Sequence, residues 1–132
     1  MKKLTVSKAK KDAWKHFSLY IRARDCGFSD QGPCFTCGKV YPLKLLQAGH
    51  WIPGRHNAVL FDERNVHAQC YHCNVGLKGN PIVYYDKMLK IYGSDICEEL
   101  KSLDSQLRQF KVPDLIELAD YYKQLLKVGA NG

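Results

Sequence analysis

Cys34-Phe35-Thr36-Cys37 and Cys70-Tyr71-His72-Cys73 are the two stretches that decide the fold of this chain. In each stretch two residues separate the cysteines, which places two sulfur atoms within a single turn of backbone. One tetrahedral zinc ion needs two such pairs to complete a closed four-sulfur site. Cysteines that serve only as small buried residues rarely fall into two pairs at this spacing. The sequence therefore predicts a zinc site formed by Cys34, Cys37, Cys70 and Cys73.

A zinc ion held by four thiolates has no open coordination position and cannot activate water. The predicted zinc is therefore structural, and any chemistry must come from other residues. Cys26 and Cys97 lie outside the pairs and are interpreted as ordinary thiols. Cys26 is close enough in sequence to Cys34 to remain an alternative ligand. Thiolates persist as metal ligands in a reducing compartment, so a cytoplasmic protein is expected.

Composition and charge indicate a globular domain with one basic segment. The 132 residues are 45% hydrophobic, which is ordinary for a single domain spanning 1–132. No apolar run reaches the length of a membrane span, and no signal peptide is recognised. The net charge is +7, and residues 1–24 contain eight Lys and Arg residues against one acid. Such a cluster suits a polyanion such as DNA, although it is also typical of a solvated helix face. The candidate DNA contacts on it are Lys8, Lys11, Lys15 and Arg22.

Hydrophobic periodicity predicts an α+β fold in three parts. Residues 1–25 form a basic arm and a helix that Ser7 caps, with Trp14, Phe17 and Ile21 on its buried side. Residues 33–80 form the zinc core, with strands at 45–52 and 65–69, a shorter candidate strand at 58–61, and a helix start near Asn74. Residues 81–132 are helical, and the expected helices span 81–92, 94–110 and 114–128.

Three polar residues of the core form a candidate catalytic set. His50 and Asn65 fall on the two predicted strands, and Asn74 falls at the helix start. Hydrolysis of a phosphodiester needs a base that deprotonates water and a cation that holds the phosphate. Histidine titrates near neutral pH, so His50 is the candidate base. Asn65 is a candidate to fix the His50 ring or its loop. The amide oxygen of Asn74 is a hard ligand suited to Mg²⁺ or Mn²⁺.

The order of these residues resembles the zinc-containing HNH, or ββα-metal, endonucleases, and most closely the NinG (Rap) family of phage recombination proteins. The resemblance covers about residues 12–93, and its motifs are Pro33–Gly38, Ala48-Gly49-His50, Phe61–Cys70 and Cys73-Asn74 with Lys78-Gly79-Asn80. It implies a small ββα-metal (HNH-like) core and a metal-dependent endonuclease that acts on branched DNA such as Holliday junctions and D-loops. For a phage-encoded protein, it also implies the cytoplasm of the bacterial host.

One position departs from the common HNH pattern. The acidic residue that usually precedes the catalytic histidine and binds the metal is replaced by Gly49. His67 is the leading substitute ligand, because alternation along a strand turns it to the same side as Asn65. Asp62, Glu63 and His56 are weaker alternatives, and His72 is interpreted as a surface residue. Further candidate phosphate contacts are Arg55, Arg64, Lys78 and Lys87.

Two other functions are compatible with the same sequence. A non-catalytic zinc-stabilised module that binds nucleic acid would explain the cysteines and the basic helix, but it gives no reason for the order of His50, Asn65 and Asn74. A domain in which zinc only supports protein interactions is the third alternative. Resolution of a two-fold junction requires two cuts, so a homodimer through the C-terminal helices is a further hypothesis.

Overall fold

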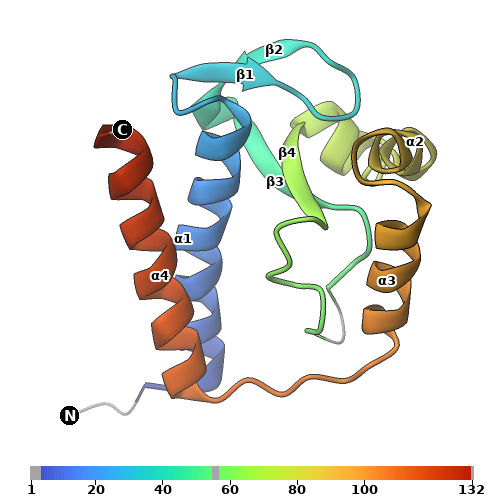
Figure 1. Ribbon diagram of the computed structural model, residues 1–132. Helices are drawn as coiled ribbons and strands as arrows, with labels where there is room; N and C mark the ends of the chain where they lie inside the picture. The colour runs from blue at the N-terminus through green and yellow to red at the C-terminus, as the bar shows by residue number, and fades with distance from the viewer. Residues whose placement is uncertain (1–3, 55–56, 132) are drawn as a thin grey trace.

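The structure is a computed structural model that describes residues 4–54 and 57–131, with only the backbone of Asn131. The predicted roles of Arg55 and His56 lie outside the described residues. The elements, in chain order, are α1 (Val6–Asp25), β1 (Gln31–Pro33), β2 (Val40–Pro42), η1 (Leu43–Leu45), β3 (Leu46–His50), β4 (Val66–Cys70), η2 (His72–Gly76), α2 (Pro81–Tyr92), α3 (Ser94–Asp104) and α4 (Val112–Asn131) (Figure 1). This mixture of helices and short strands confirms the predicted α+β class.

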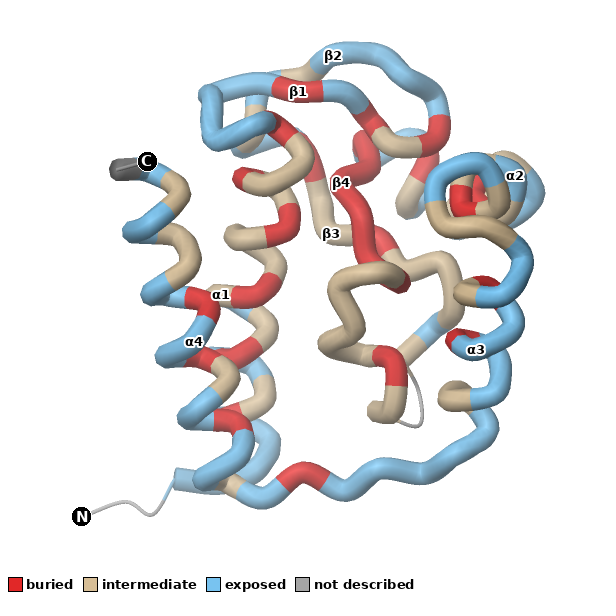
Figure 2. Tube along the Cα trace, viewed as in Figure 1, coloured by how far each residue is buried: buried red, intermediate tan, exposed pale blue. Residues whose placement is uncertain are grey.

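Helices α1 and α4 lie side by side and run in the same direction (Figure 1). Helix α1 begins at Val6, and its cap is Thr5 instead of the predicted Ser7, because the hydroxyl of Thr5 accepts a hydrogen bond from the amide of Lys8 at 3.2 Å. The buried positions Ala13, Phe17 and Ile21 recur every fourth residue and face α4 and the sheet. Figure 2 shows that burial is concentrated where these two helices face each other and along β4.

Strands β3 and β4 form an antiparallel sheet whose two faces meet different helices. Residues paired across such a sheet point to the same face. His50 pairs with Val66, which packs against Phe17 of α1, so His50 lies on the α1 face. Gly49 pairs with His67, whose side chain contacts Tyr84 of α2. Consecutive residues of β3 are therefore directed to opposite sides of the sheet.

The two cysteine pairs lie at one end of this sheet. Cys34 and Cys37 lie in the loop of an antiparallel hairpin formed by β1 and β2, which the sequence did not predict. The second pair spans the end of β4 and the start of η2, a five-residue π-helical segment. The helix expected near Asn74 is therefore only this short segment, and the longer helix begins at Pro81 as predicted.

Two sequence predictions in this part of the chain are wrong. Residues 58–61 form turns instead of a strand, because the amides of Leu60 and Asp62 bond to nearby carbonyls while the side chain of Val59 enters the core. Helix α3 ends at Asp104 and not at Phe110. The chain leaves this helix and crosses to the α1–α4 layer, where Phe110 packs against Ala13 and Leu115.

The C-terminal helices use their apolar sides within the chain. Tyr84 and Met88 of α2 pack with Cys97 and Leu100 of α3, which explains the burial of the Cys97 thiol. The buried side of α4, including Leu115 and Tyr122, packs against α1. None of the helices within residues 4–54 and 57–131 is both long enough and apolar enough to cross a membrane.

Candidate functional site

The four paired cysteines meet at one point. The Sγ atoms of Cys34, Cys37, Cys70 and Cys73 all lie within 4.8 Å of one another, and Cys37 and Cys70 are 3.9 Å apart. Tetrahedral zinc with Zn–S bonds of about 2.3 Å places its sulfur ligands about 3.8 Å apart. The four thiols therefore fit a zinc ion. Cys26 is buried against the same cluster but is not part of the four-sulfur group, so the alternative assignment of Cys26 as a ligand is not supported.

The first cysteine loop favours the thiolate form of Cys34, whereas burial and the neighbouring thiols raise the pKa of Cys37 in the absence of a metal. Burial by itself would raise the pKa of the Cys34 thiol, but the backbone amide of Cys37 and the hydroxyl of Thr36 contact its sulfur and lower the pKa to about 6. Gly38 closes this loop with a φ of 78°, a conformation that costs glycine little. The amide of Gly38 donates to the carbonyl of Cys34 at 2.9 Å.

His50 is held at the end of β3 as a neutral imidazole of defined tautomer. Its ring stacks on Trp14 of α1, with centroids 5.0 Å apart and planes inclined by 15°. Its Nε2 atom lies 3.1 Å from the carbonyl oxygen of Leu60. A carbonyl can only accept, so Nε2 carries the proton and Nδ1 carries the lone pair. Burial lowers the pKa of His50 below its ordinary value, which keeps the ring neutral near pH 7. Nδ1 makes no hydrogen bond to another described residue.

Asn65 fixes the loop that follows β3. Its side chain is fully buried, and its Oδ1 accepts from the amide of Ile52 at 2.9 Å. Its Nδ2 donates to the carbonyls of Ile52 and Val59 at 2.8 and 3.2 Å. This loop leads directly to the Leu60 carbonyl that orients His50. Of the two alternatives predicted for Asn65, the structure therefore shows contact with the loop and not with the ring.

Asn74 lies on the opposite side of β3, next to Gly49. Its Nδ2 donates to Gln47 Oε1 at 2.8 Å. A Cβ atom placed on Gly49 would lie 2.9 Å from Asn74 Oδ1. The amide oxygen of Asn74 is therefore directed at the position from which an acidic side chain would extend in the common HNH pattern. The structure thus places Asn74 and His50 on opposite sides of β3, and the role of Asn74 as a metal ligand stays a prediction.

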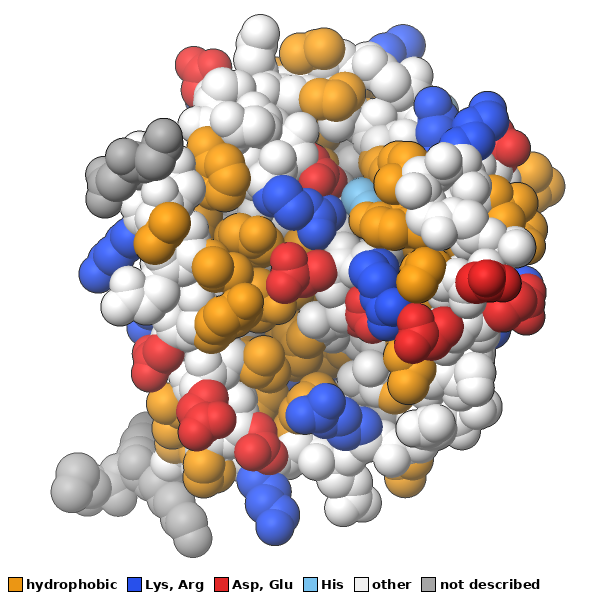
Figure 3. Space-filling model, in the orientation of Figure 1, with side chains coloured by type: hydrophobic (Ala, Val, Ile, Leu, Met, Phe, Trp, Pro, Cys, Tyr) orange, Lys and Arg blue, Asp and Glu red, His pale blue; other side chains and the backbone are white. Residues whose placement is uncertain are grey.

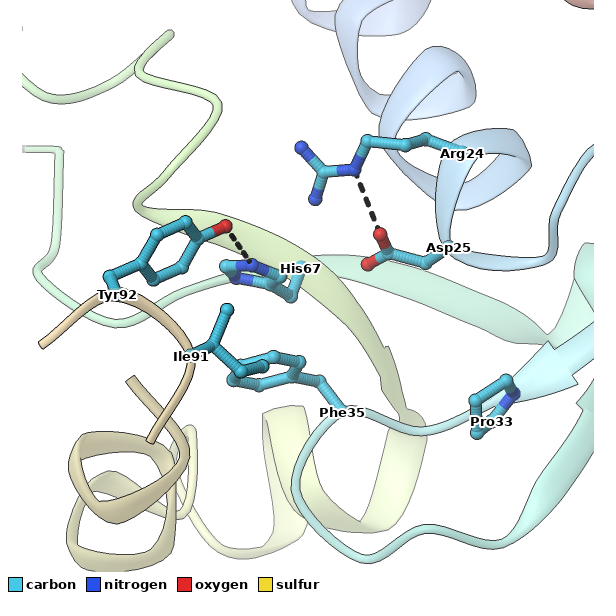
Figure 4. Close-up of a pocket in the computed structure, with 7 residues that line it drawn as sticks. All are labelled: Arg24, Asp25, Pro33, Phe35, His67, Ile91 and Tyr92. Atoms are coloured by element: carbon cyan, nitrogen blue, oxygen red, sulfur yellow. Dashed lines mark hydrogen bonds and ion pairs between the residues drawn. The ribbon is translucent and has the colours of Figure 1, made fainter. Parts of the chain in front are cut away.

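His67 has partners that the sequence did not indicate. It is 4% exposed, and its ring stacks on Phe35 with centroids 3.9 Å apart. Its Nδ1 contacts the hydroxyl of Tyr84 at 3.1 Å, and its Nε2 contacts the hydroxyl of Tyr92 at 2.9 Å; Figure 4 shows the contact with Tyr92. Tyr84 donates its only hydroxyl proton to the carbonyl of Gly49, so His67 Nδ1 donates to Tyr84 and His67 Nε2 accepts from Tyr92. Burial lowers the pKa of His67 to about 4. Neither nitrogen can bind a metal without the loss of a tyrosine partner, so His67 is not carried further as a ligand.

The cavity beside His67 is built around a paired charge. It has a volume of about 360 Å³, and Arg24, Asp25, Phe35 and Tyr92 line it together with His67 (Figure 4). Arg24 pairs with Asp25 at 2.8 Å and donates to two backbone carbonyls, including that of Val66 at 2.9 Å. Asp25 accepts from the amide of Ala68 at 2.7 Å. These bonds attach the end of α1 to β4 and give Arg24 and Asp25 a structural role.

Of the basic residues predicted to contact DNA, some are exposed to solvent and others already make bonds within the protein. Lys8, Lys11 and Lys15 are exposed on α1, and Lys78 is exposed after η2. Arg22 is half-buried and donates to the carbonyl of Ser18. Arg64 is paired with Asp62 at 2.8 Å and with Glu99 at 2.6 Å, which raises its pKa, so its charge is already compensated. On the face shown in Figure 3, basic and acidic side chains are interspersed around hydrophobic side chains near α4, and this face carries no uniform positive charge.

A basic cavity adjoins the His50 side of the sheet. It has a volume of about 470 Å³ and is lined by Ser7, Lys10, Lys11, Trp14, Lys15 and Leu60. Trp14 stacks on His50, and the carbonyl of Leu60 accepts the His50 hydrogen bond. Sequence reasoning missed both residues as parts of the site, because only the tertiary fold brings them to His50.

The fold and the site define a small α+β protein in which four cysteines, close enough together to hold a metal ion, lie at one end of a two-stranded sheet. The family model described as Bacteriophage Lambda NinG protein matches residues 1–131, and the chain belongs to this NinG family. Protein ninG of Escherichia phage 933W is 30% identical over 118 residues, which cover 89% of this chain and 56% of that protein. The ninG proteins of Salmonella phage P22 and Escherichia phage lambda are 29% and 28% identical over the same length, covering 89% of this chain and 55% of each of theirs.

The chain thus spans about half the length of the curated relatives it matches. No solved structure has significant similarity to the chain. The predicted resemblance to the NinG phage proteins is confirmed.

Proposed function

We propose that this protein is a metal-dependent endonuclease that hydrolyses phosphodiester bonds in branched DNA, such as Holliday junctions and D-loops. The observation that carries the proposal is the state of His50. Its Nε2 is committed to the carbonyl of Leu60, its pKa is lowered by burial, and its Nδ1 makes no hydrogen bond to another of the described residues. A buried structural histidine would be expected to engage both nitrogens, as His67 does.

In the proposed reaction, His50 acts as the general base. Nδ1 accepts a proton from water, the water oxygen forms a bond to phosphorus, and the bond from phosphorus to the leaving sugar oxygen breaks. The leaving oxygen then takes up a proton. The carbonyl of Leu60 stabilises the imidazolium that forms, because it accepts from Nε2–H at 3.1 Å. Asn65 acts as a positioning residue, since it holds the loop that presents this carbonyl.

A divalent cation such as Mg²⁺ or Mn²⁺ would stabilise charge on the scissile phosphate and on the leaving oxygen. Asn74 is the proposed ligand from this chain, because its Oδ1 is directed at the side of Gly49 from which the acidic side chain of the common HNH pattern would extend. The four cysteines would hold zinc as a structural ion, and no step of the reaction involves it.

The lysines of α1 are the proposed DNA contacts. Lys11 and Lys15 line the cavity that Trp14 and Leu60 share with the His50 region. A DNA backbone bound along this helix would bring its phosphates toward the base. Arg64 is left out of the proposed interface, because its two acidic partners compensate its charge.

The proposal includes a homodimer, because resolution of a symmetric junction requires two cuts. The apolar side of α4 packs against α1 and is not available for a second chain. The outer side of this helix presents Tyr121 and Val128, which are seven residues apart and 52% and 67% exposed. This outer side is therefore the proposed contact between copies.

The test compares binding with cutting. The zinc-loaded protein is incubated with a labelled four-way junction and with linear duplex of the same sequence, in Mg²⁺, in Mn²⁺ and in EDTA. We expect metal-dependent cleavage of the junction in preference to the duplex. Tight binding without cleavage in either metal would contradict the enzyme proposal and support a non-catalytic nucleic-acid-binding module.

A further inference from the structure

A buried acceptor without a partner lies beside Gly49. Gln69 is fully buried in β4, and its Oε1 is the only buried side-chain nitrogen or oxygen of the described residues that lacks a hydrogen bond. An unpaired buried acceptor is rare in folded proteins and is costly unless something outside the chain satisfies it. Gln69 is therefore a candidate for contact with a ligand.

The orientation of the Gln69 amide is fixed by its other end. Its Nε2 donates to the carbonyl of Gly79 at 3.0 Å and contacts the hydroxyl of Thr36 at 3.1 Å. A flip of the amide would set Oε1 against the Gly79 carbonyl, where two acceptors would face each other. The oxygen must therefore point away from Gly79, toward Gly49 and Asn74.

The same oxygen explains why residue 49 is a glycine. A Cβ atom on Gly49 would overlap Gln69 Oε1 and would lie 2.9 Å from Asn74 Oδ1. Any side chain at position 49, including the acid of the common HNH pattern, is excluded while Gln69 keeps this position. Two amide oxygens thus lie next to the space from which a carboxylate would otherwise extend.

We propose that Gln69 replaces the missing acidic ligand and binds a divalent cation together with Asn74. Amide oxygens are hard donors of the kind that Mg²⁺ and Mn²⁺ prefer. Both amides are neutral, so a phosphate group would balance most of the charge of the cation. Because this phosphate is that of the substrate, the assignment rests on the proposed nuclease function. Asn74 is itself held by Gln47, which leaves its Oδ1 free to act with Gln69.

The direct test uses Mn²⁺ as a paramagnetic probe of the zinc-loaded wild-type protein. Substoichiometric Mn²⁺ is added, and the side-chain amide NMR signals of all asparagines and glutamines are followed. We expect the signals of Gln69 and Asn74 to broaden first, before those of the exposed Gln31 and Gln106. Persistence of the Gln69 signal while other signals broaden would overturn the proposal. This readout needs no catalytic activity.

Variants provide a second, independent measurement. Gln69→Met keeps the length of the side chain but removes the oxygen, and Gln106→Met is the matched control on an exposed residue. Loss of residues that only support a metal ligand costs about 10- to 100-fold in affinity, so loss of a ligand should raise the Mn²⁺ dissociation constant at least about tenfold. An unchanged constant in Gln69→Met would contradict the proposal.

A side chain at position 49 and the Gln69 amide cannot occupy the same space, and this allows a test in which Mn²⁺ affinity should increase. Gly49→Asp alone should displace the Gln69 amide and destabilise the fold, whereas Gly49→Asp with Gln69→Ala should be more stable than the single variant and bind Mn²⁺ more tightly than wild type, because a carboxylate takes the place of the amide. Weaker Mn²⁺ binding in the folded double variant would count against the site. If the protein cleaves the junction but Mn²⁺ does not bind at Gln69, only this inference is refuted. If Mn²⁺ binds at Gln69 but the protein does not cleave the junction, only the nuclease proposal is refuted.

Discussion

Asn65→Ala should destabilise the protein far more than Asn74→Ala. Asn65 is fully buried and makes three side-chain hydrogen bonds, two to Ile52 and one to Val59. At about 1 kcal/mol for each bond, the substitution should lower the free energy of unfolding by about 3 kcal/mol. Domains of this size are stable by about 5–15 kcal/mol, so the loss is large but leaves a folded protein to measure.

Asn74 provides the matched control. It is half-buried, and among the described residues its side chain makes a single hydrogen bond, to Gln47. Asn74→Ala should therefore cost about 1 kcal/mol or less. Urea unfolding of both variants at saturating zinc, followed by circular dichroism, gives the two values. Equal losses, or a loss below about 1 kcal/mol for Asn65→Ala, would refute the positioning role assigned to Asn65.

Three further outcomes are expected. Strong chelation of zinc should unfold the domain, and full helical circular dichroism in the metal-free protein would contradict a structural site at Cys34, Cys37, Cys70 and Cys73. The double substitution Lys11→Ala and Lys15→Ala should weaken junction binding several-fold and reduce its salt dependence. Arg64→Ala should leave binding unchanged, because the charge of Arg64 is paired with Asp62 and Glu99. Equal effects of the two changes would refute the distinction between available and paired charges. The folded-state pKa of His67 is about 4 and the ordinary value is 6.5, so its contribution to stability is complete above pH 6.5 and is lost progressively as the pH falls from 6.5 through 4. Between about pH 7.5 and pH 5.5, wild type should therefore lose about 1 kcal/mol more than His67→Gln in urea unfolding. Identical losses would contradict the assignment.

Local signals in the sequence predicted the parts of the structure that depend on local spacing. The two-residue gaps within each cysteine pair led directly to the four-sulfur group, because that geometry is set within one turn of backbone. The spacing of Phe17 and Ile21 likewise identified the buried side of α1. The end of α3 could not be predicted from the local spacing of residues. Leu107 continues the periodic pattern, but the chain leaves the helix so that Phe110 can join the α1–α4 core.

The details of the site depend on contacts between segments far apart in the sequence. Alternation alone suggested that His67 could replace the acid missing at Gly49, and the structure does place both on one face of the sheet. It could not show that Tyr84 and Tyr92 occupy the His67 nitrogens. Nor could it show that Gln69 fills the space beside Gly49, because this requires the register of β3 on β4.

The tautomer of His50 is a second case. Its sequence position identified it as a candidate base, but the direction of its lone pair depends on Leu60, ten residues away in a turn that had been predicted as a strand. Trp14, from the N-terminal helix, then fixes the plane of the ring. The orientation of the His50 ring is therefore a property of the assembled fold.

The most direct test of the proposed function is the single-turnover cleavage rate of a four-way junction by wild type, His50→Ala and the control His72→Ala, which alters an exposed histidine. General bases contribute about 10²- to 10⁴-fold to a rate, so His50→Ala should lose at least about 100-fold in rate while zinc content, folding and junction affinity are retained. His72→Ala should match wild type. The wild-type rate should rise with pH to a plateau, with its midpoint below 6.5, because burial lowers the pKa of His50. Undiminished cleavage by a folded His50→Ala would contradict the account.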